Sequence, residues 1–138
     1  MEKALFSLES FRFEEVEMHL GDTSSSMKLS IVPSGVFFCE ESRYELLLVF
    51  NALKDDMAEE GNDVVVSITC KASFKFSDIH SLNDIPDFFY SNSIAILFPY
   101  VRSFISSVTL QANVMPIVLP VMNLSSLQET LKNKTEVC

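Results

Sequence analysis

The chain has 138 residues, of which 48% are hydrophobic, and its formal net charge at pH 7 is −9. This length predicts one domain over residues 1–138, and the negative charge disfavours binding to nucleic-acid phosphates. The greasiest runs, residues 94–101 and 114–122, are shorter than the about 20 residues of a membrane-spanning helix, so we expect no membrane insertion.

The first part of the sequence predicts four strands separated by loops. The expected strands cover residues 5–20, 27–32, 43–53 and 64–76, with loops at 21–26 and 57–63. The second expected strand ends at Pro33. The last has the clearest pattern, because its apolar residues occupy every second position for 13 residues. A period of two over this length favours an antiparallel strand with one buried face.

Helical spacing begins after these strands. Apolar residues recur every three or four positions from Ile94 to Val108, which predicts a helix. Asn83 and Asp84 are candidate caps for an earlier start of this helix. Pro99 removes one backbone hydrogen bond, so we expect the helix to kink or break nearby, within residues 95–98.

A second, short helix is expected over residues 124–132, with Asn123 as its N-cap. The linker between the two helices, residues 112–122, is apolar but contains Pro116 and Pro120, so we expect it to be extended. Such a segment either seals the core beneath it or offers an apolar surface to a partner. Strands followed by helices predict an α+β fold with one antiparallel sheet and helices on one face.

Catalytic and metal-binding motifs are absent from the sequence. His19 and His80 lie far apart, and neither has a cysteine at a metal-ligand spacing. There is no glycine-rich phosphate loop and no nucleophile elbow. Cys70 falls on the apolar side of a strand and is expected in the core. We therefore predict no enzyme activity, no cofactor and no metal site.

The cysteines and the N-terminus bear on location. The three cysteines are odd in number and far apart, which favours a reducing, cytoplasmic environment over a disulfide framework. Residues 1–11 have no basic region before an apolar run, so we expect no signal peptide.

Two clusters carry alternative interpretations. Glu14, Glu15 and Glu17 are either a solvated strand edge or a docking patch for a basic partner. Phe88 and Phe89 precede another aromatic residue, so at least one of the three must point away from any single face. That residue is a candidate for an interface or a groove.

Residues 96–102, Ile-Leu-Phe-Pro-Tyr-Val-Arg, resemble the ILFPYAR signature in the main helix of the SecB family of chaperones. Residues 121–124 are similar to the PVNF of that family, and residues 11–14 to its ISFE. The resemblance covers about the whole chain. It implies a four-stranded antiparallel sheet with a long kinked helix and a short C-terminal helix. It also implies a homotetramer, built as a dimer of dimers, that holds unfolded polypeptides without catalysis.

The resemblance places polypeptide binding on the linker and on neighbouring aromatic residues. The candidate residues are Val114, Met115, Ile117, Leu119 and Val121 in the linker, with Phe88 and Phe89 as the wall. Residues 110–113 replace the Ser-Arg-Gly type of turn that follows the main helix in the family. The linker is therefore expected to sit differently here.

Three functions fit the resemblance and the composition. The first is an export chaperone that keeps preproteins competent for translocation. The second is a SecB-like chaperone dedicated to one partner, such as the antitoxin of a toxin–antitoxin system. The third is a structural or adaptor subunit that holds one peptide or a small apolar ligand.

Docking to the SecA motor depends on acidic residues in the family. Here Glu14 matches one acidic position, but the other matching positions hold Ser10, Ser67 and Thr69. We therefore expect weak SecA binding that relies on Glu14 and its neighbours Glu15 and Glu17.

Overall fold

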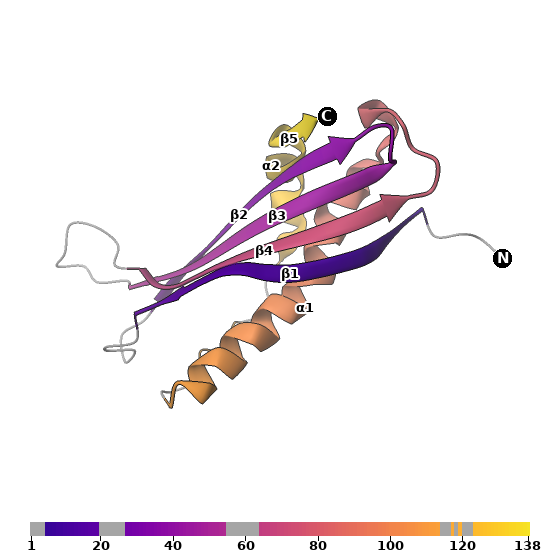
Figure 1. The fold of residues 1–138 in the computed structure, drawn as a ribbon. Coiled ribbons are helices and arrows are strands. Elements are labelled where there is room, and N and C mark those ends of the chain that lie inside the picture. Colours follow the sequence, from indigo (N-terminus) through magenta and orange to yellow (C-terminus); the bar gives the residue numbers. More distant parts are fainter. Residues whose placement is uncertain (1–4, 20–26, 55–63, 114–116, 118, 120–122) are drawn as a thin grey trace.

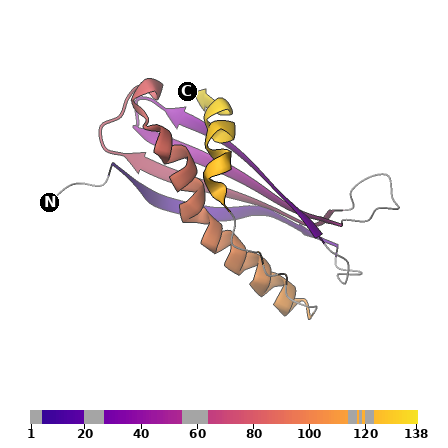
Figure 2. The same ribbon diagram turned by 180° about the vertical axis from the view of Figure 1, so that it is seen from behind.

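The protein is described here by a computed structural model, which covers residues 5–19, 27–54, 64–113, 117, 119 and 123–138. It has an α+β fold in which helices cover one face of a sheet (Figures 1 and 2). In chain order the elements are β1 (Phe6–Met18), β2 (Met27–Phe38), β3 (Arg43–Lys54), β4 (Val64–Phe76), the 3₁₀ helix η1 (Leu82–Asp84), α1 (Asp87–Gln111), the 3₁₀ helix η2 (Leu124–Leu127), α2 (Gln128–Asn133) and β5 (Thr135–Val137).

The sheet has five strands in the order β1-β4-β3-β2-β5. The first four pair antiparallel, as expected, and β4 has the predicted bounds. The expectation of a purely antiparallel, four-stranded sheet is wrong, because β5 pairs in parallel with residues 35–37 of β2. A three-residue strand shows no periodicity, so the sequence pattern could not reveal it.

Two bulges shape β1. Glu9 and Glu14 each interrupt the register with β4, so that the alternation of side chains shifts by one residue at each place. Phe6 and Phe13 therefore both pack against the core, although one has an even number and the other an odd number. Bulges on an edge strand also hinder its pairing with other chains.

Strand β2 runs through Pro33 to Phe38 and does not end at Pro33 as the sequence suggested. The N–H of Gly35 donates to the carbonyl of Lys134, on the side of β2 that faces away from β3. Backbone groups alternate in direction along a strand, so the N–H that Pro33 lacks would point to the same outer side. The described part of β5 begins beyond that position, and no bond to β3 is lost.

Helix α1 crosses the face of the sheet diagonally, and its C-terminal end extends beyond the edge strand β1 (Figures 1 and 2). It begins at Asp87 after Pro86, whereas the candidate caps Asn83 and Asp84 both belong to η1 and do not cap α1. The helix continues through Pro99 without a break. Ala95 and Pro99 are both exposed, so the carbonyl that loses its partner faces solvent.

The length and composition of α1 would also suit a membrane span, with a mean hydropathy of 1.4 over its most apolar window. However, buried residues occur along α1 from Phe89 to Thr109. Packing on the sheet therefore accounts for part of the apolar character of this helix.

The C-terminal part agrees with the expected short helix over residues 124–132. It forms η2 followed by α2, and the side chain of Asn123 accepts a hydrogen bond from the N–H of Ser125 at 3.1 Å. Asn123 is therefore the N-cap, as predicted. Both elements pack beside α1, so the helical layer covers the inner face of the sheet.

Candidate functional site

Several large apolar side chains of α1 stay exposed, although this helix provides much of the core. Phe88 is 51% exposed, Tyr100 is 47% exposed, and Ile96 and Leu110 are also exposed. Soluble chains commonly use such apolar surface to bind partners. Ile96 and Tyr100 are four residues apart and share one face of the helix. Phe88 and Leu110 lie near its two ends, so the four residues do not form one patch.

One exposed region lies where α1 passes β1, and we call it the aromatic edge. The ring of Phe104 stacks on that of Phe13 with a centroid distance of 4.0 Å, and the ring of Tyr100 lies 4.5 Å from that of Phe11. All four side chains keep part of their surface in solvent. The aromatic edge therefore packs the helix against the sheet and leaves apolar surface exposed beside the edge strand β1.

A hollow of about 370 Å³, which we call the α1 hollow, lies along the second half of α1. Its described lining comprises Phe98, Pro99, Arg102, Ser103 and Ser106. An open site with an apolar base and a few polar groups suits a side chain of a bound polypeptide better than it suits catalysis.

The linker is fixed to α1 at Ile117, close to this hollow. The hydroxyl of Ser106 donates to the carbonyl of Ile117 at 2.9 Å, and the N–H of Ile117 donates to Thr109 Oγ1 at 2.9 Å. Thr109 in turn donates to the carbonyl of Ile105. Both backbone groups of Ile117 are thus satisfied by helix side chains. Ile117 therefore has no free backbone group with which to pair a bound polypeptide as a β-strand, which is one way that an extended linker can bind a partner.

The sequence-predicted wall residues separate in the structure. Phe88 is exposed and available to a partner, but Phe89 is fully buried and packs against Tyr44 and Phe76. Consecutive residues of a helix point about 100° apart, so only one of the two can face the core. The expectation that Phe89 lines a groove needs correction, because it is a central core residue.

The linker candidates also separate. Leu119 is 1% exposed and belongs to the core, which agrees with the alternative that the linker seals the sheet. Ile117 is half-buried and keeps surface in solvent. The remaining candidates, Val114, Met115 and Val121, lie outside the described residues. Their role in binding stays a prediction.

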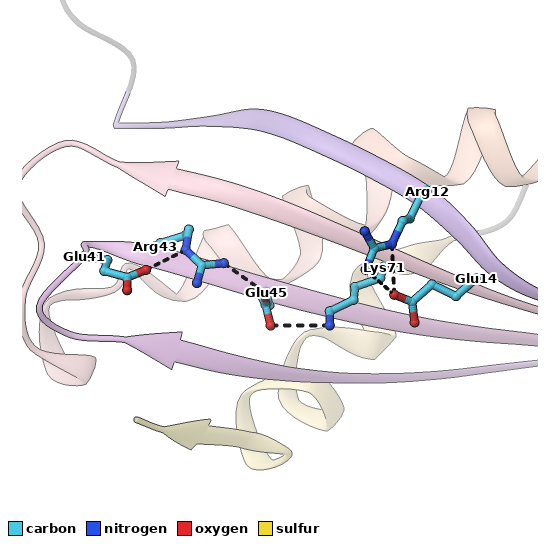
Figure 3. Close-up of polar contacts among 6 residues, drawn as sticks. All are labelled: Arg12, Glu14, Glu41, Arg43, Glu45 and Lys71. Atoms are coloured by element: carbon cyan, nitrogen blue, oxygen red, sulfur yellow. Dashed lines mark hydrogen bonds and ion pairs between the residues drawn. The ribbon is translucent and has the colours of Figure 1, made fainter.

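The acidic residues proposed for motor docking lie on β1 at the edge of the sheet. Glu14 forms an ion pair with Arg12 at 2.8 Å (Figure 3), and Glu17 lies 3.3 Å from His19. Glu15 is exposed and pairs in register with Thr69. An ion pair on the same strand partly neutralises Glu14, so less of its charge is available to a basic partner.

The outer face of the sheet, which the helices leave uncovered, carries a chain of matched charges. Arg43 bridges Glu41 and Glu45 at 2.9 Å each, and Glu45 also lies 3.8 Å from Lys71 (Figure 3). The hydrogen bond to Glu45 is the main reason that the pKa of Arg43 is raised. Because these charges compensate one another, this face does not present a strong field of one sign.

The described residues offer little for catalysis. No group of three or more His, Cys, Asp or Glu side chains gathers in a way that could hold a metal ion, within the part of the chain that the structure describes. Burial raises the pKa of the Cys70 thiol to about 11, so it remains protonated and a poor nucleophile.

Sequence reasoning missed the polar lining of the α1 hollow. The sequence pattern did not single out Ser106 or Thr109, and Arg102 entered only as the last residue of the helix signature. A run of hydroxyl residues beside an apolar linker is a signal for side chains that bind backbone groups. Which hydroxyl meets which carbonyl depends on tertiary packing.

No family model matches the chain. One curated relative, an uncharacterised protein of Methanocaldococcus jannaschii, is 38% identical over 56 residues, which cover 41% of this chain. The match spans about a third (36%) of the length of that relative.

Among solved structures, the chain is similar to the SecB-like chaperone Rv1957 of Mycobacterium tuberculosis, in complex with a ChAD peptide from the HigA1 antitoxin. The TM-score is 0.69 at 12% identity, over 86% of this chain and 91% of the other. A protein of unknown function from Streptococcus agalactiae matches with a TM-score of 0.47 at 12% identity, over 84% of this chain and 97% of the other. The likeness to Rv1957 shows that the fold of the chain is SecB-like.

Proposed function

We propose that this chain is a chaperone that holds unfolded or extended polypeptide without catalysing a reaction. The observation that carries the proposal is the SecB-like fold combined with the α1 hollow, which lies beside a linker fixed at Ile117. An extended segment can place a bulky side chain in the hollow and lay its neighbours along the exposed surface of α1. Such contacts are mainly apolar and therefore tolerate varied sequences.

Two observations favour a chaperone that is dedicated to one partner over a general chaperone. The Rv1957 structure holds a peptide from an antitoxin. In addition, the matched charges around Glu45 and the ion pair of Glu14 leave a poor surface for a basic docking partner such as a SecA tail. General delivery of preproteins for export, with weak SecA binding, is the second candidate. An adaptor that holds one fixed peptide is the third.

We also propose a homotetramer built as a dimer of dimers. The aromatic edge supports this assembly, because it leaves part of Tyr100 and Phe104 in solvent where α1 passes β1. A second copy that packs there would bury this apolar area. Light scattering should give four times the chain mass of 15.6 kDa, and a stable monomer at micromolar concentration would contradict the assembly.

The proposed compartment is the cytoplasm. All three cysteines are free, and Cys138 is exposed. Free thiols on a surface persist in a reducing environment.

A photo-crosslinking amino acid at Ser103 tests the proposed function in the native host. Ser103 is exposed and lines the α1 hollow, whereas Lys75 is exposed on β4, does not line the hollow and provides the control position. We expect crosslinks to other polypeptides from position 103 well above those from position 75. One dominant crosslinked chain, identified by mass spectrometry, supports the dedicated chaperone, and many preproteins support the export chaperone. Equal yields from both positions would contradict binding at the hollow.

A further inference from the structure

Arg102 is the only basic residue of α1. The single other charged residue of this 25-residue helix, Asp87, lies at its first position and accepts a hydrogen bond from Lys132 at 2.8 Å. Arg102 is thus the only charged residue of α1 after its first position, within a chain whose net charge is −9. A cation in such a place needs a physical explanation, because a neutral residue would pack there at lower desolvation cost.

The side chain of Arg102 is half-buried and lines the α1 hollow. No described residue forms an ion pair or a side-chain hydrogen bond with its guanidinium group, although Arg12 and Arg43 both pair with glutamates. Its donors are therefore available to a ligand, as far as the described part of the chain is concerned. A guanidinium carries five N–H donors and matches the two oxygens of a carboxylate.

We infer that Arg102 binds a carboxylate of the held polypeptide, so that the hollow selects segments in which a bulky apolar residue lies next to an acidic group. This inference rests on the proposed function and names the class of segment that the site prefers. Phe98 and Pro99 provide the apolar base for the bulky side chain, and Arg102 provides the charge at its rim. The carboxylate belongs either to an Asp or Glu side chain or to the C-terminus of the partner.

The neighbouring hydroxyls support a carboxylate at this place. Ser103 also lines the hollow and forms no side-chain hydrogen bond with another described residue, so its hydroxyl can donate to the same anion. Ser106 already donates to the carbonyl of Ile117 and holds the linker in position. A cation and a free donor beside an apolar base favour an anionic group over a neutral or basic one. The acidic surface elsewhere repels acidic segments in general, so this preference is local.

Fluorescence anisotropy with three labelled peptides tests the inference. The peptides share an apolar core of Leu and Phe and differ at one adjacent residue, which is Asp, Asn or Lys. All three peptides carry an amidated C-terminus, which removes the terminal carboxylate. A second form of the Asn peptide keeps its free C-terminal carboxylate. For the wild-type chain we expect the Asp peptide to bind about fivefold to tenfold more tightly than the Asn peptide, since hydrogen bonds to charged groups add this much.

Variants at Arg102 then identify the group responsible. Arg102→Gln should remove the preference for Asp over Asn, and Arg102→Glu should make the Lys peptide the tightest binder. Arg12→Gln is the matched control, because Arg12 is exposed on the outer face of β1 and should leave the preference unchanged. Circular dichroism and light scattering confirm that each variant keeps its fold and assembly. If the Asn peptide gains affinity only with a free C-terminus, the terminal carboxylate is the ligand.

The outcomes separate this inference from the proposed function. If wild type binds the Asp peptide and both forms of the Asn peptide equally, or if Arg102→Gln keeps the preference for a carboxylate, the role of Arg102 is wrong while polypeptide binding stands. If wild type binds none of the peptides and no unfolded protein, the proposed function itself fails.

Discussion

The phenolic oxygen of Tyr44 lies directly over Gly35, in the space that a side chain at that position would need. The same hydroxyl is 2.6 Å from Thr135 Oγ1, and Thr135 itself donates to the carbonyl of Leu131. Tyr44 is therefore the donor, and burial raises the pKa of its hydroxyl, which keeps the proton in place. This contact joins β3 to β5 across β2, and it requires glycine on the strand between them.

Replacing Gly35 with alanine should destabilise the fold by about 2 kcal/mol, because the new methyl group displaces Tyr44 and weakens its bond to Thr135. Urea unfolding monitored by circular dichroism measures this change. Tyr44→Phe alone should cost about 1 kcal/mol, which is the typical value of one hydrogen bond. The double variant should lose less stability than the sum of the two single losses, because Gly35→Ala already weakens the bond to Thr135 that Tyr44→Phe removes. Strict additivity would show that Tyr44 does not limit position 35.

The neighbours Phe88 and Phe89 should respond in opposite ways to truncation. Phe89→Ala should lower the free energy of unfolding by about 3–5 kcal/mol, because its ring is fully buried among Phe6, Tyr44 and Phe76. Phe88→Ala should change it by less than about 0.5 kcal/mol, because that side chain is 51% exposed. Similar effects of both changes would contradict the orientation of α1.

The strands that could be predicted from the sequence are those whose pattern follows a single rule. In β4, apolar residues alternate without interruption, so its bounds are recovered in full. In β1, two bulges change the phase of the alternation. The sequence of β1 is rich in phenylalanine but therefore does not show which face of the strand is buried. A bulge depends on the partner strand and leaves no local signature in these residues.

Prolines were less disruptive than the sequence suggested. Pro33 lies where its missing N–H faces away from β3, and Pro99 lies on the solvent side of α1. Neither proline ends its element, and which side of each element it faces depends on neighbours that are distant in the sequence. For the same reason the candidate site was predicted in part: the signature located α1 and the linker, but the hydroxyl contacts at Ile117 and the burial of Phe89 are tertiary features.

Thr109→Val should loosen the linker with little change in volume. Valine cannot accept the hydrogen bond from the N–H of Ile117, which Thr109 Oγ1 accepts at 2.9 Å. The cost of an unpaired amide is about 1–3 kcal/mol if the group stays buried, so local opening is the expected response. Hydrogen exchange followed by mass spectrometry should show faster exchange of peptides that contain Ile117. Ser107→Ala, on an exposed side of the same helix, provides the control and should leave exchange unchanged.

Stability should decline in alkaline solution. Burial raises the pKa of Cys70 from 9.0 to about 11, so the folded state favours the protonated thiol. This contribution is fully present below about pH 9, the unfolded value, and is lost as the pH rises toward 11. The pKa of Tyr90 is also raised by burial and acts in the same direction. Urea midpoints between pH 7 and pH 11 should therefore fall above pH 9, and Cys70→Ala should reduce that fall. A Cys70→Ala variant with the same profile as wild type would contradict the assignment.

Binding of an unfolded polypeptide tests the central claim most directly. Isothermal titration should compare a protein that is kept permanently unfolded by reduction and alkylation with the native form of the same protein, without nucleotide. We predict micromolar or tighter binding of the unfolded form and none of the native form. Ser103→Trp, which fills the α1 hollow, should weaken binding about tenfold, whereas Ser107→Trp, which lies outside the hollow, should not. Equal binding of the two forms, or no binding of the unfolded one, would contradict the proposal that this chain is a holding chaperone.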